Sequence, residues 1–98
     1  MLSRRSRFEL SIDILTHIKR GPTLPTPIMY GVKIPYNSLQ QMLQALDTQG
    51  LIEECSLKES SKRSKKYYRI TKKGERVLIN YNRILELMDP GELVPSLN

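Results

Sequence analysis

The sequence predicts a mainly helical α+β domain in which three helices are followed by a two-stranded hairpin and a last helix. Two observations lead to this prediction. Two short runs with strand character follow the third helix and flank a stretch that has no apolar residue from Lys58 to Lys66. Elsewhere, apolar residues recur at helical spacing in three segments separated by Pro and Gly: residues 7–20, 35–49 and 72–88.

The length of 98 residues fits one domain, which we expect to span residues 1–88, followed by a tail over residues 89–98. No run of 18 apolar residues predicts a membrane helix, and the N-terminus lacks the apolar stretch of a signal peptide. The single cysteine excludes an internal disulfide and fits a reducing compartment. We therefore expect a cytoplasmic protein.

The first helix is predicted over residues 7–20. Ser6 and Glu9 have the spacing of a capping box, in which each side chain accepts a hydrogen bond from the other residue's backbone N–H. An apolar stripe of Phe8, Ile12, Leu15 and Ile18 follows, and Gly21 with Pro22 ends the helix.

Two further helices are predicted before the hairpin. Thr26 and Pro27 are typical of an N-cap followed by a first-turn proline, so a short helix is expected over residues 27–32, burying Ile28 or Met29. The next helix, residues 35–49, ends at Gly50. Its apolar positions are Leu39, Met42, Leu43 and Leu46.

The hairpin is predicted from strands at residues 51–56 and 67–70. Strand alternation places Tyr68 and Ile70 on one face, where we expect core, and Tyr67 on the other. Tyr67 either half-covers the sheet or stacks on a sugar or base. Thr71 is expected to cap the last helix, residues 72–88, which Pro90 follows closely.

The basic residues are concentrated in one segment. Residues 58–73 hold eight Lys or Arg and one Glu, a charge of +7, whereas the whole chain carries +6. Such clustering favours a polyanionic partner, nucleic acid first and an anionic membrane surface second, over a general role in solubility.

The predicted order of elements is that of a winged helix-turn-helix. Its second and third helices form the helix-turn-helix, and its hairpin forms the wing. The third helix would enter the major groove of double-stranded DNA while the basic wing contacts phosphates.

Three segments resemble a known family: "RSRFELSIDIL", "TPIMYGVKIPYNSLQQMLQALDTQGLI" and "YYRITKKGERVL". They are similar to the small archaeal winged-helix DNA-binding proteins, including the ten-kilodalton chromatin-type proteins of Sulfolobus. The resemblance implies DNA binding, an architectural or regulatory role at the nucleoid, and a homodimer formed through the last helix. The sequence departs from the family at Pro27, where a basic residue is usual, and at Pro35, where a capping Ser is usual.

The outward face of the third helix is rich in amides. Asn and Gln side chains can bond adenine at N6 and N7, although Gln also fills solvated helix faces without a ligand. A second basic group at the N-terminus would track phosphates or reach a minor groove, or would form a tail without contacts. The predicted DNA-binding residues are Asn37, Ser38, Gln40, Gln41, Gln44, Lys62, Arg63, Lys65, Lys66, Arg4, Arg5 and Arg7.

The apolar stripe of the last helix is wide enough to serve two surfaces, one of them in a second subunit. The predicted dimer residues are Val77, Tyr81, Ile84, Leu85 and Met88. No metal-ligand cluster, phosphate-binding glycine loop or catalytic arrangement is present in the sequence, so we expect no enzyme, no cofactor and no small-molecule ligand. The alternative hypothesis is a winged-helix module that binds other proteins of a transcription or processing complex.

Overall fold

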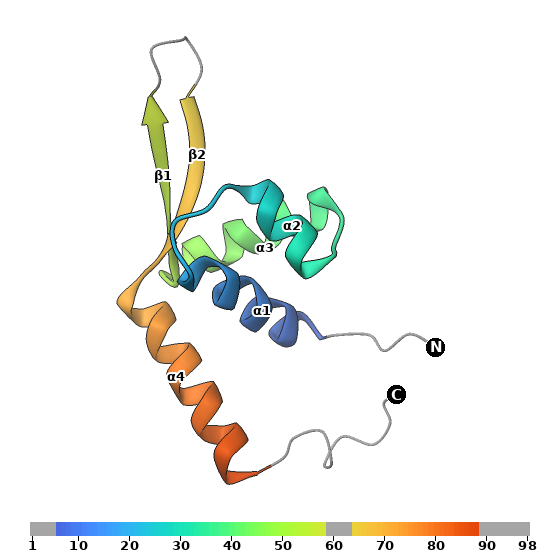
Figure 1. Cartoon of the computed structure of the whole chain (residues 1–98), viewed down its shortest axis with the longest axis vertical. Coiled ribbons are helices and arrows are strands. Elements are labelled where there is room, and N and C mark those ends of the chain that lie inside the picture. The colour runs from blue at the N-terminus through green and yellow to red at the C-terminus, as the bar shows by residue number, and fades with distance from the viewer. Residues whose placement is uncertain (1–5, 59–63, 89–98) are drawn as a thin grey trace.

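The fold class is confirmed: in the part of the chain that it describes, the computed structural model contains four helices and one antiparallel hairpin in the predicted order (Figure 1). It describes residues 6–58 and 64–88, so the expected tail over 89–98 lies outside the described residues. The elements are α1 (Arg7–Lys19), α2 (Pro25–Val32), α3 (Tyr36–Thr48), β1 (Ile52–Lys58), β2 (Ser64–Ile70) and α4 (Lys72–Leu87).

Helix α1 begins with the predicted capping box. The backbone N–H of Glu9 donates to Ser6 Oγ over 3.0 Å, and the N–H of Ser6 donates to Glu9 Oε1 over 2.9 Å. Phe8, expected in the buried stripe, is 58% exposed. This prediction was wrong because Phe8 lies in the first turn of α1, beyond the central core, where its ring packs edge-on against the half-buried Tyr81.

Helix α2 begins two residues earlier than predicted. Pro25, not Pro27, is its first residue, Leu24 is the N-cap, and no side chain caps the end, so the predicted Thr26 cap is wrong. Both prolines are tolerated because the first N–H groups of a helix have no partner within it. The helix ends at Lys33, whose left-handed φ of 65° turns the chain toward α3.

Helix α3 matches its prediction closely. Its buried residues are the four expected ones, Leu39, Met42, Leu43 and Leu46. It ends at Gly50, whose φ of +78° is readily adopted only without a side chain. No side chain caps its start, where the family resemblance implied a Ser and the sequence has Pro35.

The hairpin pairs Ile52 with Ile70 and Glu54 with Tyr68. Strand β2 starts at Ser64, earlier than the predicted residue 67, so Lys65 and Lys66 lie in a strand rather than in a loop. The loop between α1 and α2 extends this sheet. The N–H of Thr23 donates to the Tyr68 carbonyl over 3.0 Å, and the N–H of Tyr68 donates to the Thr23 carbonyl over 2.8 Å.

Helix α4 is capped by Thr71, as predicted, whose Oγ1 accepts from the N–H of Gly74 over 3.0 Å. Gly74 lies so close to the Leu51 carbonyl that an added Cβ would collide with it, so a glycine is required there. From this anchored start α4 runs alongside α1 and then away from the other helices (Figure 1). The core therefore sits among α1, α2, α3 and the base of the hairpin, and α4 adds only Leu78 to its fully buried side chains.

Candidate nucleic-acid interface

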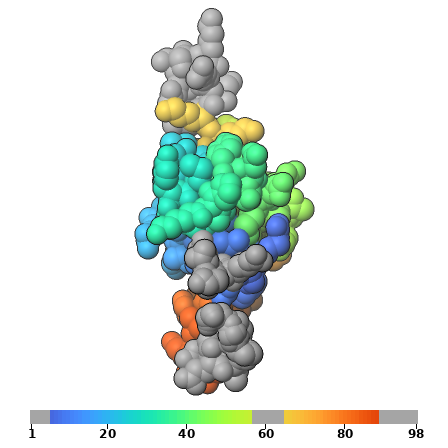
Figure 2. Space-filling model, turned by 90° about the vertical axis from the view of Figure 1, so that its right-hand side faces the viewer, coloured from blue at the N-terminus to red at the C-terminus, as the bar shows by residue number. Residues whose placement is uncertain are grey.

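Helices α2 and α3 lie side by side across one face of the molecule, with the described part of β2 above them and α4 below (Figure 2). The outward side of α3 is as polar as predicted. Asn37, Ser38, Gln41 and Gln44 are exposed, and Gln40 is half-buried. The four core residues of α3 fix this orientation, because burying them turns the amide side chains outward.

Two neighbouring hollows, of about 460 and 370 Å³, lie between α3 and the hairpin. They share Gln40, Glu54 and Tyr68, and we call them together the α3–wing groove. One end also holds Lys65 and Lys66. The residues that line the groove are Leu24, Pro25, Thr26, Tyr36, Gln40, Gln41, Leu43, Gln44, Asp47, Thr48, Glu54, Lys65, Lys66 and Tyr68.

The groove thus brings together five of the predicted DNA-binding residues: Gln40, Gln41, Gln44, Lys65 and Lys66. Asn37 and Ser38 are exposed one turn earlier on α3. Arg7 is not brought to this groove, because it lines a separate hollow between α1, α4 and the C-terminal half of α3. Arg4, Arg5, Lys62 and Arg63 lie outside the described residues.

Glu54 and Tyr36 are among the groove residues that the sequence did not predict as part of a DNA-binding surface. The Glu54 carboxylate forms an ion pair with Lys66 over 3.2 Å. Its neighbour Glu53 forms a separate pair with Arg69 over 2.8 Å. Because successive strand residues point to opposite faces, Glu54 and Lys66 share the α3 side of the sheet, and Glu53 and Arg69 share the other. The alternation of side chains along the strands, combined with a known register, would have placed Glu54 on this face of the sheet.

Electrostatics at the floor of the groove keep Tyr68 neutral. Burial raises the pKa of the Tyr68 phenol above its usual 10.0, and the negative charge of Glu54 adds to the shift. On the opposite sheet face, the hydrogen bond to Glu53 raises the pKa of the Arg69 guanidinium. Tyr68 is therefore a neutral hydroxyl beside the amides of α3.

Part of the basic segment is used within the fold. Lys73 Nζ donates to the Gln49 carbonyl over 2.8 Å, at the end of α3 where unpaired carbonyls gather. Thr71 Oγ1 likewise donates to the Gly50 carbonyl over 2.7 Å. These bonds join the start of α4 to the end of α3, so Lys73 has a structural role that the charge count alone did not distinguish.

The predicted dimer residues divide into two groups. Val77 and Tyr81 are half-buried against the subunit's own core. Ile84, Leu85 and Met88 are 47%, 42% and 45% exposed. Within residues 6–58 and 64–88, the second half of α4 therefore carries an exposed apolar surface.

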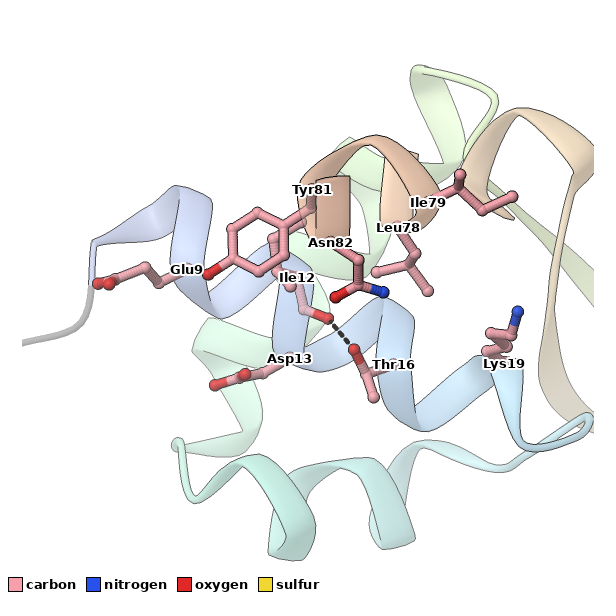
Figure 3. Close-up of a pocket in the computed structure, with 9 residues that line it drawn as sticks. All are labelled: Glu9, Ile12, Asp13, Thr16, Lys19, Leu78, Ile79, Tyr81 and Asn82. Atoms are coloured by element: carbon pink, nitrogen blue, oxygen red, sulfur yellow. Dashed lines mark hydrogen bonds between the residues drawn. The ribbon is translucent and has the colours of Figure 1, made fainter. Parts of the chain in front are cut away.

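A further hollow, of about 430 Å³, lies between α1 and α4 (Figure 3). Tyr81 and Asn82 of α4 face α1 across it, and Ile12 and Leu78 form its apolar floor. Thr16 Oγ1 donates to the Ile12 carbonyl over 2.8 Å, and Glu9 is used in the capping box. This hollow is separate from the α3–wing groove.

No group of three or more His, Cys, Asp or Glu suited to a metal occurs within residues 6–58 and 64–88. Among the helices of that same described part, none has both the length and the apolar character needed to cross a membrane.

Comparison with known proteins agrees with this geometry. A model of the winged helix-turn-helix family matches residues 4–89. The chain belongs to this family. The winged helix-turn-helix chain is also 26% identical, over 86 residues, to the uncharacterized protein MJ0287 of Methanocaldococcus jannaschii, a match covering 88% of this chain and 79% of that protein.

Solved structures similar to this winged helix-turn-helix chain include a PadR family transcriptional regulator from Eggerthella lenta, with 26% identity and a TM-score of 0.72, covering 93% of this chain and 86% of that one. A PadR family regulator from Clostridium difficile has 18% identity and a TM-score of 0.73, and the match covers 80% of this chain and 88% of that one. Bacillus subtilis PadR, solved in complex with operator DNA, has 21% identity and a TM-score of 0.67, covering 74% and 45%. The last two likenesses are of fold.

Proposed function

We propose that this protein binds double-stranded DNA as a homodimer and acts in the cytoplasm as a transcription regulator. The observation that carries the proposal is the α3–wing groove, where an uncharged amide row meets the lysines of β2. Amides suit base edges and lysines suit phosphates, so one surface holds both kinds of contact that a DNA reader needs. The similarity to PadR family regulators, one of them solved with operator DNA, supports this role.

In this arrangement α3 enters the major groove. Asn37, Gln40 and Gln41 lie in its N-terminal half, which is the part of a recognition helix that usually contacts bases. The wing lies beside the major groove of the DNA. The basic residues of the wing, Lys62, Arg63, Lys65 and Lys66, contact phosphates. Arg4, Arg5 and Arg7 would add contacts from the N-terminal side.

The homodimer is proposed through the second half of α4. Ile84, Leu85 and Met88 form an apolar surface on the described part of the chain, and a second copy of α4 offers the same surface in return. A symmetric dimer presents two α3 helices and so matches a two-fold DNA site.

An architectural role of the kind found in the Sulfolobus chromatin-type proteins is the second candidate. The observation that favours it is the concentration of basic residues in 58–73, a charge of +7, because contacts to phosphate do not depend on the DNA sequence. The two roles differ in sequence preference, because only a regulator needs base contacts that discriminate between sites.

The test is binding to a randomised duplex pool at several salt concentrations. A regulator enriches a subset of sequences, whereas an architectural protein binds the pool without enrichment. Replacing Lys62, Arg63, Lys65 and Lys66 by Ala should weaken binding to every duplex and make the slope of log K against log salt shallower, by roughly 0.9 per lost phosphate contact. Failure to bind any duplex would leave the protein-binding module as the better hypothesis.

A further inference from the structure

A carboxylate stands inside the proposed DNA-binding surface. Glu54 lines both hollows of the α3–wing groove, between Gln40 of α3 and the lysines of β2. Its Oε2 lies 3.2 Å from Nζ of Lys66, and both side chains are accessible to solvent, at 36% and 64%. A negative charge at this position opposes the approach of a polyanion.

The ion pair occupies a lysine that DNA phosphate would otherwise contact. The Glu54 carboxylate neutralises part of the positive charge of the Lys66 ammonium group, so an arriving phosphate must share this group with Glu54 or draw it away. Glu54 is also fixed in place by the sheet, because it pairs in register with Tyr68, which is buried and bridged to Thr23. The sheet therefore holds the backbone of Glu54 at a position from which its carboxylate reaches Lys66.

We propose that Glu54 is a positioning residue that holds Lys66 away from DNA phosphates and so weakens sequence-independent binding. This inference rests on the proposed function of the same groove. It assigns Glu54 the role of an internal competitor of phosphate, in a surface where the sequence predicted only attractive residues.

The hairpin supplies its own matched control. Glu53 precedes Glu54 in β1, is also paired with a basic residue of β2, and lies on the sheet face away from α3. Glu53→Gln and Glu54→Gln change the net charge of the protein by the same amount. Any difference between the two variants therefore reports the position of the charge and not its size.

The experiment measures binding of wild type, Glu54→Gln and Glu53→Gln to a random-sequence duplex from low to high salt. In Glu54→Gln, Lys66 is free to make one more phosphate contact. This contact should steepen the slope of log K against log salt by roughly 0.9 and raise the affinity for DNA by about three- to tenfold at low salt. The affinity of Glu53→Gln for the duplex should stay within about twofold of the wild-type affinity, because the charge that it removes lies on the far face of the sheet and is screened. Circular dichroism checks that both variants fold.

A second background tests whether the effect passes through Lys66. The gain from Glu54→Gln should shrink to about twofold or less when Lys66→Gln is already present, because no ammonium is left to release. A gain of the same size in both backgrounds would overturn the proposal, since Glu54 would then act by general repulsion.

Three other results would also overturn it. If Glu54→Gln and Glu53→Gln behave alike while the wild type binds duplex, the competitor role fails and the proposed function stands. If Glu54→Gln weakens binding to a preferred site and leaves random duplex unchanged, Glu54 reads a base, as a carboxylate can at cytosine N4. A wild type that binds no duplex at any salt concentration refutes the proposed function, and the inference with it.

Discussion

Helix α3 buries all four residues of its apolar stripe inside the subunit, whereas α4 buries only Gly74 and Leu78. Both helices carry apolar residues at regular helical spacing, and both pack near α1 or the hairpin. The difference lies in how far each follows the core. Helix α3 stays against it for its whole length, while α4 leaves it after Tyr81. An apolar stripe thus identifies one face of a helix, but does not by itself show that this face is buried within the subunit.

The largest effect is expected from placing charges on the exposed apolar end of α4. We expect Ile84→Asp with Met88→Asp to separate the dimer, because each side chain buried there would contribute about 1.5–3 kcal/mol. Sedimentation at micromolar concentration should give about twice the 11.4 kDa chain mass for wild type and the chain mass for the variant.

The matched control is Arg83→Asp, which lowers the net charge by the same two units on a side of α4 that faces away from the Ile84 and Met88 stripe. Arg83 is exposed, so this variant should remain dimeric. A wild type that sediments as a monomer throughout would refute the dimer.

The second prediction concerns the covered helix. Leu43→Ala should lower the free energy of unfolding by about 2–5 kcal/mol, because the Leu43 side chain is fully buried in α3. Leu87→Ala, the matched leucine on α4, should change it by less than about 0.5 kcal/mol. Urea unfolding at one fixed protein concentration measures both. Equal losses would mean that α4 is as well covered as α3.

The third prediction tests whether the polar side chains of α3 contact DNA bases. Alanine at Asn37, Gln40 or Gln41 should cost about 1–3 kcal/mol on a preferred duplex and little on random DNA. Gln49→Ala is the control, since this amide lies on the hollow that faces α1. Fluorescence anisotropy with both duplexes decides the point. Losses of equal size on the two duplexes would indicate that these residues contact only the backbone of DNA.

The smallest expected effect is a pH dependence at the floor of the α3–wing groove. The pKa of Tyr68 is raised in the folded protein, so above pH 10 the unfolded chain loses this proton first and stability falls as pH rises. The stabilising contribution is present below the usual pKa of 10.0 and is lost above it. Tyr68→Phe should flatten this part of the profile in thermal unfolding measured from pH 8 to 11. An unaltered profile would assign the loss to other groups.

The sequence predicted the helices best where one local signal decided each end. The Ser6 and Glu9 box, Gly50 and the Thr71 cap are such signals, and all three stand where they were expected. Helix α2 was misplaced because two prolines, Pro25 and Pro27, both fit a first turn. The predicted second strand was shorter than β2, because the lysines at its start have low strand propensity. In the structure, backbone pairing to β1 extends the strand through them.

The candidate site was only partly predictable. The amide face of α3 follows from helical periodicity, so Gln40, Gln41 and Gln44 could be placed from the sequence alone. The pairing of Glu54 with Lys66 depends on strand register, and a shift of one residue would have sent Glu54 to the other face. Register is set by the turn between the strands and by tertiary packing, neither of which a single sequence specifies.

The two hydrogen bonds between Thr23 and Tyr68 make a pivot for the wing. Strand β2 continues four residues beyond this point to Ser64, about 13 Å at the rise of a strand. A tilt of about 10° at the pivot therefore moves that end by roughly 2 Å, most of the length of a hydrogen bond. Thr23 lies in the loop between α1 and α2, and α1 in turn packs on α4. A small displacement of α1 against α4 that tilted the hairpin at this pivot would therefore move the Ser64 end further than it moves Thr23.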